Sequence, residues 1–442
     1  MAKTYDTYKD SGIAWIGEIP GEWEVVKIKN LAILNIPDSF IDGDWIESPY
    51  ITDDGIRYLT TGNIGDGSFK RQGNGFISIE TFKALNCKYA YPGDLVFSRL
   101  NAPYGRSCIL PNDFSEYVLA VDNVILRTTH SKKYISYITQ CDGYHKAVSE
   151  EAKGTTMKRI SRINLGNIPL PIPPLSVQQS ISSFLDTKCG EIDSLISIQE
   201  EMISELLAYK QSVITEAVTK GLDKKAKMKN SGVEWIGEIP EEWEVPHLKF
   251  ITSKIGSGST PTGGSSIYVN DGIKFIRSQN VYNNKFVLDD VAYITPEIHE
   301  QMKGTQVKVG DILFNITGGS IGRCYIVDEN LGEANVNQHV CIVRPSAIKG
   351  KYLMYFLQST AGQEQVNVLQ TGGNREGLSG SAFGNFFIPL PPLPVQQAIA
   401  TCLDEKTSQI DSLIALKQSK IESLKEYKKS IIYEYVTGKK RV

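Results

Sequence analysis

Cysteine pairs, long apolar runs and phosphate-binding loops are all missing from this chain. Its seven cysteines include no Cys-x-x-Cys pair, which excludes the usual zinc-ribbon and thiol-redox motifs and is typical of reduced cytoplasmic thiols. No apolar run approaches the ~18 residues that span a membrane, and no apolar leader opens the chain, so we expect a cytoplasmic protein without membrane contact. No Gly-x-x-x-x-Gly-Lys-Ser/Thr loop occurs, so ATP-driven motion would have to come from a partner.

An excess of positive charge is also missing. The formal net charge of the 442 residues is −3, so a DNA-binding role would need local clusters of Lys and Arg. The five histidines show no metal-ligand spacing, and we assign no metal site. With 41% hydrophobic and 22% charged residues, the composition is that of an ordinary globular protein of two to four domains.

What the chain does contain is a long internal repeat. Residues 11–25, SGIAWIGEIPGEWEV, return as residues 231–245, SGVEWIGEIPEEWEV, 220 positions later. Residues 174–179, PLSVQQ, return as residues 392–397, PLPVQQ, 218 positions later. A repeat of this length is a whole domain with its connector, not a solenoid unit. The chain is therefore one unit of about 220 residues written twice, which predicts two near-equivalent binding surfaces.

The repeat continues through the interior of each half. Residues 54–64 match residues 271–281 in alternating apolar positions, which are typical of fold-determining strands. Polar loops such as residues 98–104 and 315–321 differ instead. One scaffold with two surface chemistries would suit two readers of two different targets. Simple drift after duplication is the alternative.

Each half has a mixed region, then a proline-rich stop, then a long helical pattern. Short alternating runs and Gly-rich turns predict mixed α/β structure at about 27–162 and 248–380. Prolines at 169–174 and 389–392 end these regions and suit the first turn of a helix. The apolar residues that follow are spaced by three and four, a narrow stripe suited to one partner helix. Two such helices most simply pack on each other; the alternative is that each lies on its own domain.

These features resemble the DNA specificity (S) subunit of a type I restriction–modification system. The resemblance rests on residues 8–25, on their repeat, and on the proline-rich stretches that end in Leu-x-Val-Gln-Gln, and it covers the whole chain. It implies an α+β fold with two mixed α/β target-recognition domains joined by long helices. The helices would form an antiparallel coiled-coil spacer with a pseudo-two-fold internal repeat. The expected boundaries are 1–165 and 223–383 for the two domains, and 166–222 and 384–442 for each proline stop with its helix.

The resemblance also implies a function. A subunit of this kind is no enzyme; it recognises a bipartite, asymmetric DNA sequence, one half-site per recognition domain. Its implied partners are double-stranded DNA, two methyltransferase subunits that carry S-adenosylmethionine and methylate adenine at N6, and restriction subunits that use ATP and Mg. No cofactor is expected in this chain itself. Two repeated recognition domains match the local two-fold axis of duplex DNA. Because the two domains differ in sequence, the two half-sites need not be palindromic.

Polar and basic loops at equivalent places are the candidates for DNA contact. Hydroxyl, amide and guanidinium groups suit base edges, while Lys, Arg and exposed N–H groups suit phosphates. The first-half candidates are Thr60, Thr61, Asn63, Arg99, Asn101, Arg106, Lys153, Gly154, Thr155, Lys158, Arg159 and Arg162. The second-half candidates are Ser257, Ser259, Thr260, Arg277, Ser278, Gln279, Asn280, Arg323, Gly372, Gly373, Asn374 and Arg375. The loop at 255–261 is found only in the second half. Structural strand-end turns and a merely solvated basic loop are the alternatives.

Two rival functions stay open on the sequence. Residues 101–104, Asn-Ala-Pro-Tyr, are similar to the Asn-Pro-Pro-Tyr loop with which adenine methyltransferases hold the target amine. Against a self-contained methyltransferase, the second half has Gly-Gly-Ser-Ile at 318–321, and no cofactor-binding strand–loop–helix is evident. The other rival is a coiled-coil scaffold without a DNA role.

Overall fold

The computed structural model describes residues 4–154, 157–369 and 377–442. The chain forms two compact units. The first comprises Met1–Gln199 together with Ser419–Val442, and the second comprises Glu200–Gln418.

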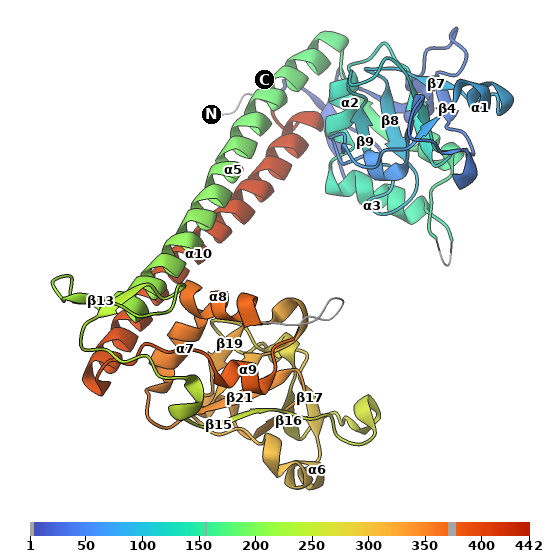
Figure 1. The fold of residues 1–442 in the computed structure, drawn as a ribbon. Helices are drawn as coiled ribbons and strands as arrows, with labels where there is room; N and C mark the ends of the chain where they lie inside the picture. The colour runs from blue at the N-terminus through green and yellow to red at the C-terminus, as the bar shows by residue number, and fades with distance from the viewer. Residues whose placement is uncertain (1–3, 155–156, 370–376) are drawn as a thin grey trace. The chain divides into compact units, whose positions relative to one another are not determined.

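Two long helices confirm the helical pattern read from the sequence. Helix α5 spans Leu175–Lys220 and helix α10 spans Leu393–Val436, with 46 and 44 residues. Each unit contains one mixed α/β domain and one part of each helix (Figure 1). The predicted combination of mixed α/β domains with long helices is therefore confirmed.

A central antiparallel sheet organises the mixed domain of the first unit. Its strand order is β4-β11-β8-β9, and every residue of β8 (Leu95–Ser98) is buried because both faces are covered. Leu95 and Phe97 share a core with helices, while Val96 packs toward a second sheet, as the two-residue period of a strand requires. That second sheet has the order β6-β5-β10-β7 and a parallel pair, β5 with β10.

The other elements of the first unit have the following bounds: β1 (Tyr8–Asp10), β2 (Glu18–Pro20), β3 (Glu24–Lys27), β4 (Phe40–Asp42), β5 (Ile56–Leu59), β6 (Phe76–Ile77), α1 (Ile79–Ala84), β7 (Tyr89–Ala90), β9 (Ser107–Ile109), β10 (Tyr117–Leu119), β11 (Asn123–Leu126), α2 (Lys132–Ile138), α3 (Asp142–Glu151), α4 (Arg162–Asn167) and β12 (Pro169–Ile172).

The second unit repeats this plan. Its central sheet has the order β15-β21-β18-β19, and its second sheet, β17-β16-β20, again contains a parallel pair, β16 with β20. In β18 (Ile312–Asn315), Ile312 and Phe314 face one core and Leu313 faces the other. The repeat seen in the sequence is therefore a repeat of core and of strand order, except that the place of β7 is taken by an isolated bridge between Gln306 and Asn335.

The other elements of the second unit have the following bounds: β13 (Met228–Asn230), β14 (Glu238–Pro240), β15 (Thr252–Ser257), β16 (Ile273–Ile276), β17 (Ala292–Ile294), α6 (Pro296–Gln301), β19 (Cys324–Ile326), β20 (Ala334–Val336), β21 (Val340–Pro345), α7 (Gly350–Gln358), α8 (Thr360–Leu369) and α9 (Gly380–Gly384).

The two long helices pack antiparallel within each unit. In the first unit, the rings of Phe184 and Tyr435 lie 4.5 Å apart and Asp193 pairs with Lys428 at 2.7 Å, so numbers rise along one helix as they fall along the other. In the second unit, Lys210 forms the equivalent ion pair with Asp411, also at 2.7 Å. The predicted antiparallel pair is confirmed.

The repeated Trp-containing segment receives the end of a long helix. Gly438 follows α10 with a φ of +73°, and a Cβ there would lie 2.2 Å from the Pro20 ring and 3.2 Å from Trp23. Gly221 follows α5 with a φ of +75°, and a Cβ there would lie 3.1 Å from Trp243. Glycine suits both places because the left-handed conformation ends each helix against a ring. Each marker segment is therefore the place where the helix of the opposite repeat ends.

A buried tyrosine fastens three elements together in each unit. The Tyr134 hydroxyl lies 2.9 Å from the carbonyls of both Pro171 and Val436, and Tyr352 repeats the arrangement in the second unit. Burial raises the pKa of both phenols well above the usual value, so each hydroxyl remains a donor. The hydroxyl joins the domain, the proline stop and the last turn of a long helix.

The sequence predicts buried, reduced cysteines and no membrane-spanning segment. All seven cysteines are free, and six of them are buried. Within the described ranges, no helix is both long and apolar enough to cross a membrane.

Candidate nucleic-acid interface

One arginine joins two candidate loops in the first unit. Arg106 is 8% exposed, and its guanidinium donates to five backbone carbonyls. Two of them belong to the loop after β5: the carbonyls of Ile64 at 2.6 Å and Thr61 at 2.8 Å. The other three, those of Leu100, Asn101 and Pro103, belong to the loop after β8. The two loops therefore lie side by side at one edge of the domain.

The basic loop reaches the same edge through its backbone. Arg159 forms antiparallel bridges with Leu100 and with Lys153, and the N–H of Ile160 donates to the carbonyl of Arg99 at 3.1 Å. Three loops that are distant in sequence thus meet at one edge. This convergence is what the DNA-contact hypothesis expects of them.

A row of alternating charges underlies these three loops. Arg162 pairs with Asp42 at 2.9 Å, and Asp42 pairs with Arg99 at 3.2 Å. Asp122 then lies 3.6 Å from both Arg99 and Arg159. These contacts are ion pairs of modest geometry, since the nearest atoms do not all align as hydrogen bonds. The row contains three cations and two anions, so the edge keeps a local positive excess.

Four candidates are corrected, because their side chains belong to the fold. Arg106 donates to the five carbonyls above, and Arg99, which is 7% exposed, donates to the carbonyls of Ile160 and Val121. Asn63 is 2% exposed; it accepts from the N–H of Thr60 and donates to the carbonyls of Lys70 and Gln72. Asn280 holds the equivalent turn of the second unit. We assign these four to positioning the loops and not to DNA contact.

The remaining candidates of the first unit are accessible. Thr60, Asn101, Lys153, Gly154, Lys158 and Arg159 are exposed, while Thr61 and Arg162 are half-buried. Thr155 lies outside the described residues. The side chain of Arg159 is 58% exposed even though its guanidinium is held near Asp122. Hydroxyl, amide and cationic groups therefore face solvent along this edge.

The second unit brings its candidate loops together in the same way. Thr317 forms an antiparallel bridge with Gly377, and the Nδ2 group of Asn315 donates to the carbonyl of Ser278 at 2.8 Å. Of the candidates, Ser257, Ser259, Thr260 and Gln279 are exposed, and Arg277, Ser278 and Arg323 are half-buried. Gly372, Gly373, Asn374 and Arg375 lie outside the described residues.

The Ser/Thr loop of the second half has a structural counterpart after all. Gly43 and Gly258 occupy the same place, because their N–H groups donate to Asn123 and Val340 at 2.9 Å each. A Cβ at either glycine would overlap a neighbouring carbonyl, at 2.3 Å and 2.0 Å. Ser257–Thr260 is therefore equivalent to the segment that starts at Asp42. The sequence comparison missed this match because the offset here is 215 positions, against 217 to 220 elsewhere.

Basic side chains of the second edge are held differently from those of the first. Arg323 matches Arg106 in the repeat, but its guanidinium lies over the ring of Tyr282, 5.0 Å from the ring centre. Arg277 and Gln279 both bond to Asp290, through its carbonyl at 2.6 Å and its carboxylate at 2.7 Å. Equivalent backbones thus carry side chains in different environments.

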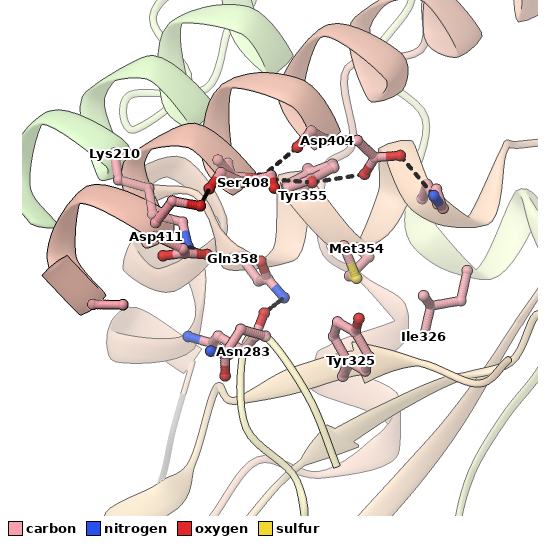
Figure 2. A pocket seen from close by; sticks show the side chains of 15 residues that line it. Lys210, Asn283, Tyr325, Ile326, Met354, Tyr355, Gln358, Asp404, Ser408 and Asp411 are labelled. Atoms are coloured by element: carbon pink, nitrogen blue, oxygen red, sulfur yellow. Dashed lines mark hydrogen bonds and ion pairs between the residues drawn. The ribbon is translucent and has the colours of Figure 1, made fainter. Parts of the chain in front are cut away.

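A polar groove beside the long helices occurs in both units, with volumes of about 510 Å³ in the second and 460 Å³ in the first. In Figure 2, Tyr355 bonds to Asp404 and Lys210 pairs with Asp411. Burial, together with the neighbouring Asp404, raises the pKa of Tyr355, so it stays a donor. Because these charges are paired with one another, we assign the groove to fastening the domain onto the helices.

In the methyltransferase-like loop, Arg106 occupies two backbone carbonyls, those of Asn101 and Pro103, and the second position, which is proline in the methyltransferase loop, is Ala102 here. Among the residues that the structure describes, no three His, Cys, Asp or Glu side chains gather as a metal site. This geometry gives the methyltransferase rival no support.

Sequence reasoning missed the side chains that hold the candidates in place. Asp42 and Asp122 pair with arginines in the first unit, and Gln338 and His339 contact Thr260 and Thr317 in the second. A detectable signal existed, since Asp122 and His339 are 217 positions apart and each directly precedes an aligned strand.

Known proteins share this organisation. Residues 20–207 and 240–426 match the family described as "Type I restriction modification DNA specificity domain", once in each half. The chain is 30% identical over 303 residues to the type I restriction enzyme MjaVIII specificity subunit of Methanocaldococcus jannaschii, covering 67% of each protein. It is 26% identical over 340 residues to the EcoBI specificity subunit of Escherichia coli, covering 74% of this chain and 69% of that one.

Solved structures share the fold. A chain from "Structural basis underlying complex assembly and conformational transition of the type I R-M system" superposes with a TM-score of 0.71 at 15% identity, covering 95% of this chain and 98% of that chain. At this identity the likeness shows the fold alone. The family match spans most of both halves, and the chain therefore belongs to the DNA specificity subunits of type I restriction–modification systems, which are non-catalytic.

Proposed function

We propose that this chain recognises a bipartite, asymmetric DNA sequence, with one half-site read at the loop edge of each unit. The observation that carries the proposal is the pair of edges itself. The same backbone framework, fixed at Gly43 and at Gly258, presents basic groups in one unit and mainly neutral polar groups in the other. Because base edges differ in their donors and acceptors, such edges would select different bases.

The proposed partners are double-stranded DNA, two methyltransferase subunits and restriction subunits. The methyltransferase would bind S-adenosylmethionine, the restriction subunit would bind ATP and Mg, and no cofactor is assigned to this chain. The repeat supports two copies of one partner, because a surface formed by the repeated strand order occurs once in each unit.

The long helices are proposed to set the distance between the half-sites. Helix α5 continues without interruption over 46 residues, which corresponds to roughly 69 Å at about 1.5 Å per residue. A continuous helix transmits a fixed spacing better than a flexible linker does.

The test is an exchange of recognition domains. A chain in which residues 248–383 come from another specificity subunit would be assembled with its methyltransferase, and the methylated motif read by long-read sequencing. We expect a hybrid motif, with the original first half-site and a new second one. Retention of both original half-sites would refute the proposal.

Two further measurements separate the rival functions. Crosslinking of tritiated S-adenosylmethionine to the isolated chain would favour a self-contained methyltransferase, and we expect none. If the chain were a scaffold without a DNA role, its complex with the methyltransferase should not retard duplex DNA in a gel-shift assay. The second measurement needs the complex, because DNA affinity of the isolated chain is expected to be weak.

A further inference from the structure

One backbone position that recurs at both edges carries an acidic side chain in the first unit, Asp122, and an imidazole in the second, His339. In the first unit, the N–H of Arg99 donates to the carbonyl of Asp122 at 2.8 Å, and in the second, the N–H of Ile316 donates to the carbonyl of His339 at 3.0 Å. Asp122 directly precedes β11, and His339 directly precedes the matching strand β21. Asp122 and His339 are therefore structurally equivalent, and what differs between them is the side chain.

In the first unit this position orients an arginine. The Asp122 carboxylate is 18% exposed and lies 3.6 Å from the guanidinium of Arg159, which is 58% exposed. The backbone of Arg159 is fixed by its bridges to Leu100 and Lys153. At 3.6 Å the carboxylate attracts the guanidinium without a hydrogen bond, and this attraction favours one orientation of the exposed donors. Two parallel donors match the N7 and O6 acceptors of guanine.

In the second unit the whole charged row is replaced. The bridges and strand register put Ser257 in the place of Asp42, Ile316 in that of Arg99 and Gly377 in that of Arg159. With His339 in the place of Asp122, no charged pair is left at these positions. At these positions the second unit therefore offers neutral hydrogen-bonding groups where the first unit has charged ones.

Neutral groups around His339 hold an exposed glutamine. The Nδ1 atom of His339 lies 2.7 Å from the Thr317 hydroxyl, and its Nε2 lies 3.2 Å from the Nε2 of Gln338. This fits an imidazole whose proton is on Nδ1 and which accepts from the Gln338 amide. The Oε1 of Gln338 accepts from Thr260. One amide N–H and one oxygen lone pair remain, and this pair matches the N7 and N6 groups of adenine.

We infer that Asp122 and His339 are specificity-determining residues that act through their neighbours: Asp122 aims Arg159 at a guanine in the first half-site, and His339 aims Gln338 at an adenine in the second. The inference rests on the proposed function, because it requires that both edges face DNA. Asp122 and His339 are positioning residues, while Arg159 and Gln338 make the base contacts.

The test reads each half-site separately. The complex of this chain with its methyltransferase would methylate plasmid libraries randomised across both half-sites, and long-read sequencing would give the motif. Asp122→Asn and Arg159→Lys should each relax the same single guanine of the first half-site, by about 5- to 100-fold in preference, with the second half-site unchanged. Gln338→Ala should relax one adenine of the second half-site only.

A matched control and the unchanged half-site make the outcomes decisive. Asp113→Asn removes another carboxylate that pairs with an arginine, Arg71 at 2.8 Å. Asp113 lies between β9 and β10, outside the three loops, and its replacement should leave the motif intact. Gln338 is exposed, so its replacement tests the inference even if Asp122→Asn fails to fold.

Three results would overturn the inference: an unaltered motif, relaxation of both half-sites together, or loss of methylation on every sequence by a folded, assembled complex. A wild-type complex without any bipartite motif would instead refute the proposed function.

Discussion

Replacing Arg106 by lysine keeps the charge but removes the geometry that joins two loops. The guanidinium of Arg106 reaches five carbonyls from 8% exposure. A lysine ammonium has three donors on a flexible stem. At least two of the five carbonyls must therefore lose their partner in Arg106→Lys. Desolvation lowers the pKa of Arg106, because burial opposes the charged form, so the hydrogen bonds to carbonyls take the place of water around the guanidinium.

The expected loss of stability depends on which carbonyls lose their hydrogen-bond donor. A hydrogen bond to a charged group contributes about 1.5–3 kcal/mol, so two lost bonds give a limit of about 3–6 kcal/mol. Water can replace the partner at the exposed residues Asn101 and Pro103, but not at Ile64, which is buried. We therefore expect a loss of about 2–4 kcal/mol in the free energy of unfolding of the first unit.

Hydrogen exchange resolved by peptide is the assay, because it reports the two loops directly. Arg106→Lys should speed exchange in residues 60–66 and 99–105 and weaken binding of the assembled complex to DNA. Arg323→Lys is the matched control, since Arg323 stacks on Tyr282 and does not donate to carbonyls in the described structure; its loss should change stability by about 1 kcal/mol or less. Equal protection of both loops in Arg106→Lys and the native chain would refute the reasoning.

Four other expectations are simpler. Tyr134→Phe should lower the melting temperature of the first unit by about 2–12 °C. A lost buried hydrogen bond costs about 1–3 kcal/mol, and each kcal/mol shifts the melting temperature of a unit of this size by about 2–4 °C. Calorimetry should give a similar shift for Tyr352→Phe, and no shift in either variant would contradict the role of the hydroxyl. Lys158→Ala should reduce by about one the slope of log affinity against log salt for the assembled complex, measured by fluorescence anisotropy, whereas an unchanged slope would mean that the loop is merely solvated. At pH 8 the folded chain should expose at most one thiol to a water-soluble disulfide reagent, because six of the seven cysteines are buried. Burial also raises the pKa of Cys108 and Cys341 to about 12 and keeps these two thiols protonated. All seven should react in guanidinium chloride, and several fast-reacting thiols in the folded chain would count against the buried core. Insertion of four residues after Ser204, about one helical turn, should change the gap between half-sites in the methylated motif and neither half-site, and a constant gap would show that the helices are not the ruler.

Features that repeat in sequence could be predicted well, because they are set by local periodicity. The two long helices, the mixed domains and the proline stops all follow from apolar spacing and from Gly and Pro positions. The finer placement of the stripe was less accurate. Leu195 and Leu413 fit its spacing, yet each is 47% exposed. A 3.6-residue helix drifts relative to a fixed apolar spacing, so some stripe positions turn toward solvent.

Side-chain roles at the edges could not be predicted, because they depend on contacts between distant loops. Arg106 and Arg323 occupy matching positions of the repeat, yet one is surrounded by carbonyls and the other lies on a tyrosine ring. Asn63 is of a residue type that suits base reading, but its amide closes its own turn. Residue type limits what a side chain can bond to, while only the fold decides which partners are near enough.

Completion of each unit by the opposite repeat explains why some segments stay alike while the edges diverge. The last part of α10 supplies Ile432 and Val436 to the core of the first unit, and the last part of α5 supplies Ile214 and Val218 to the core of the second. Each helix end must therefore fit the Trp-containing segment and the tyrosine of the other repeat, so a change on one side strains a contact across repeats. Among the described residues, the side chains at the tips of the edge loops, such as Asp122 and His339, bond within their own repeat. These side chains are free to differ, as Asp122 and His339 do, without disturbing the shared scaffold.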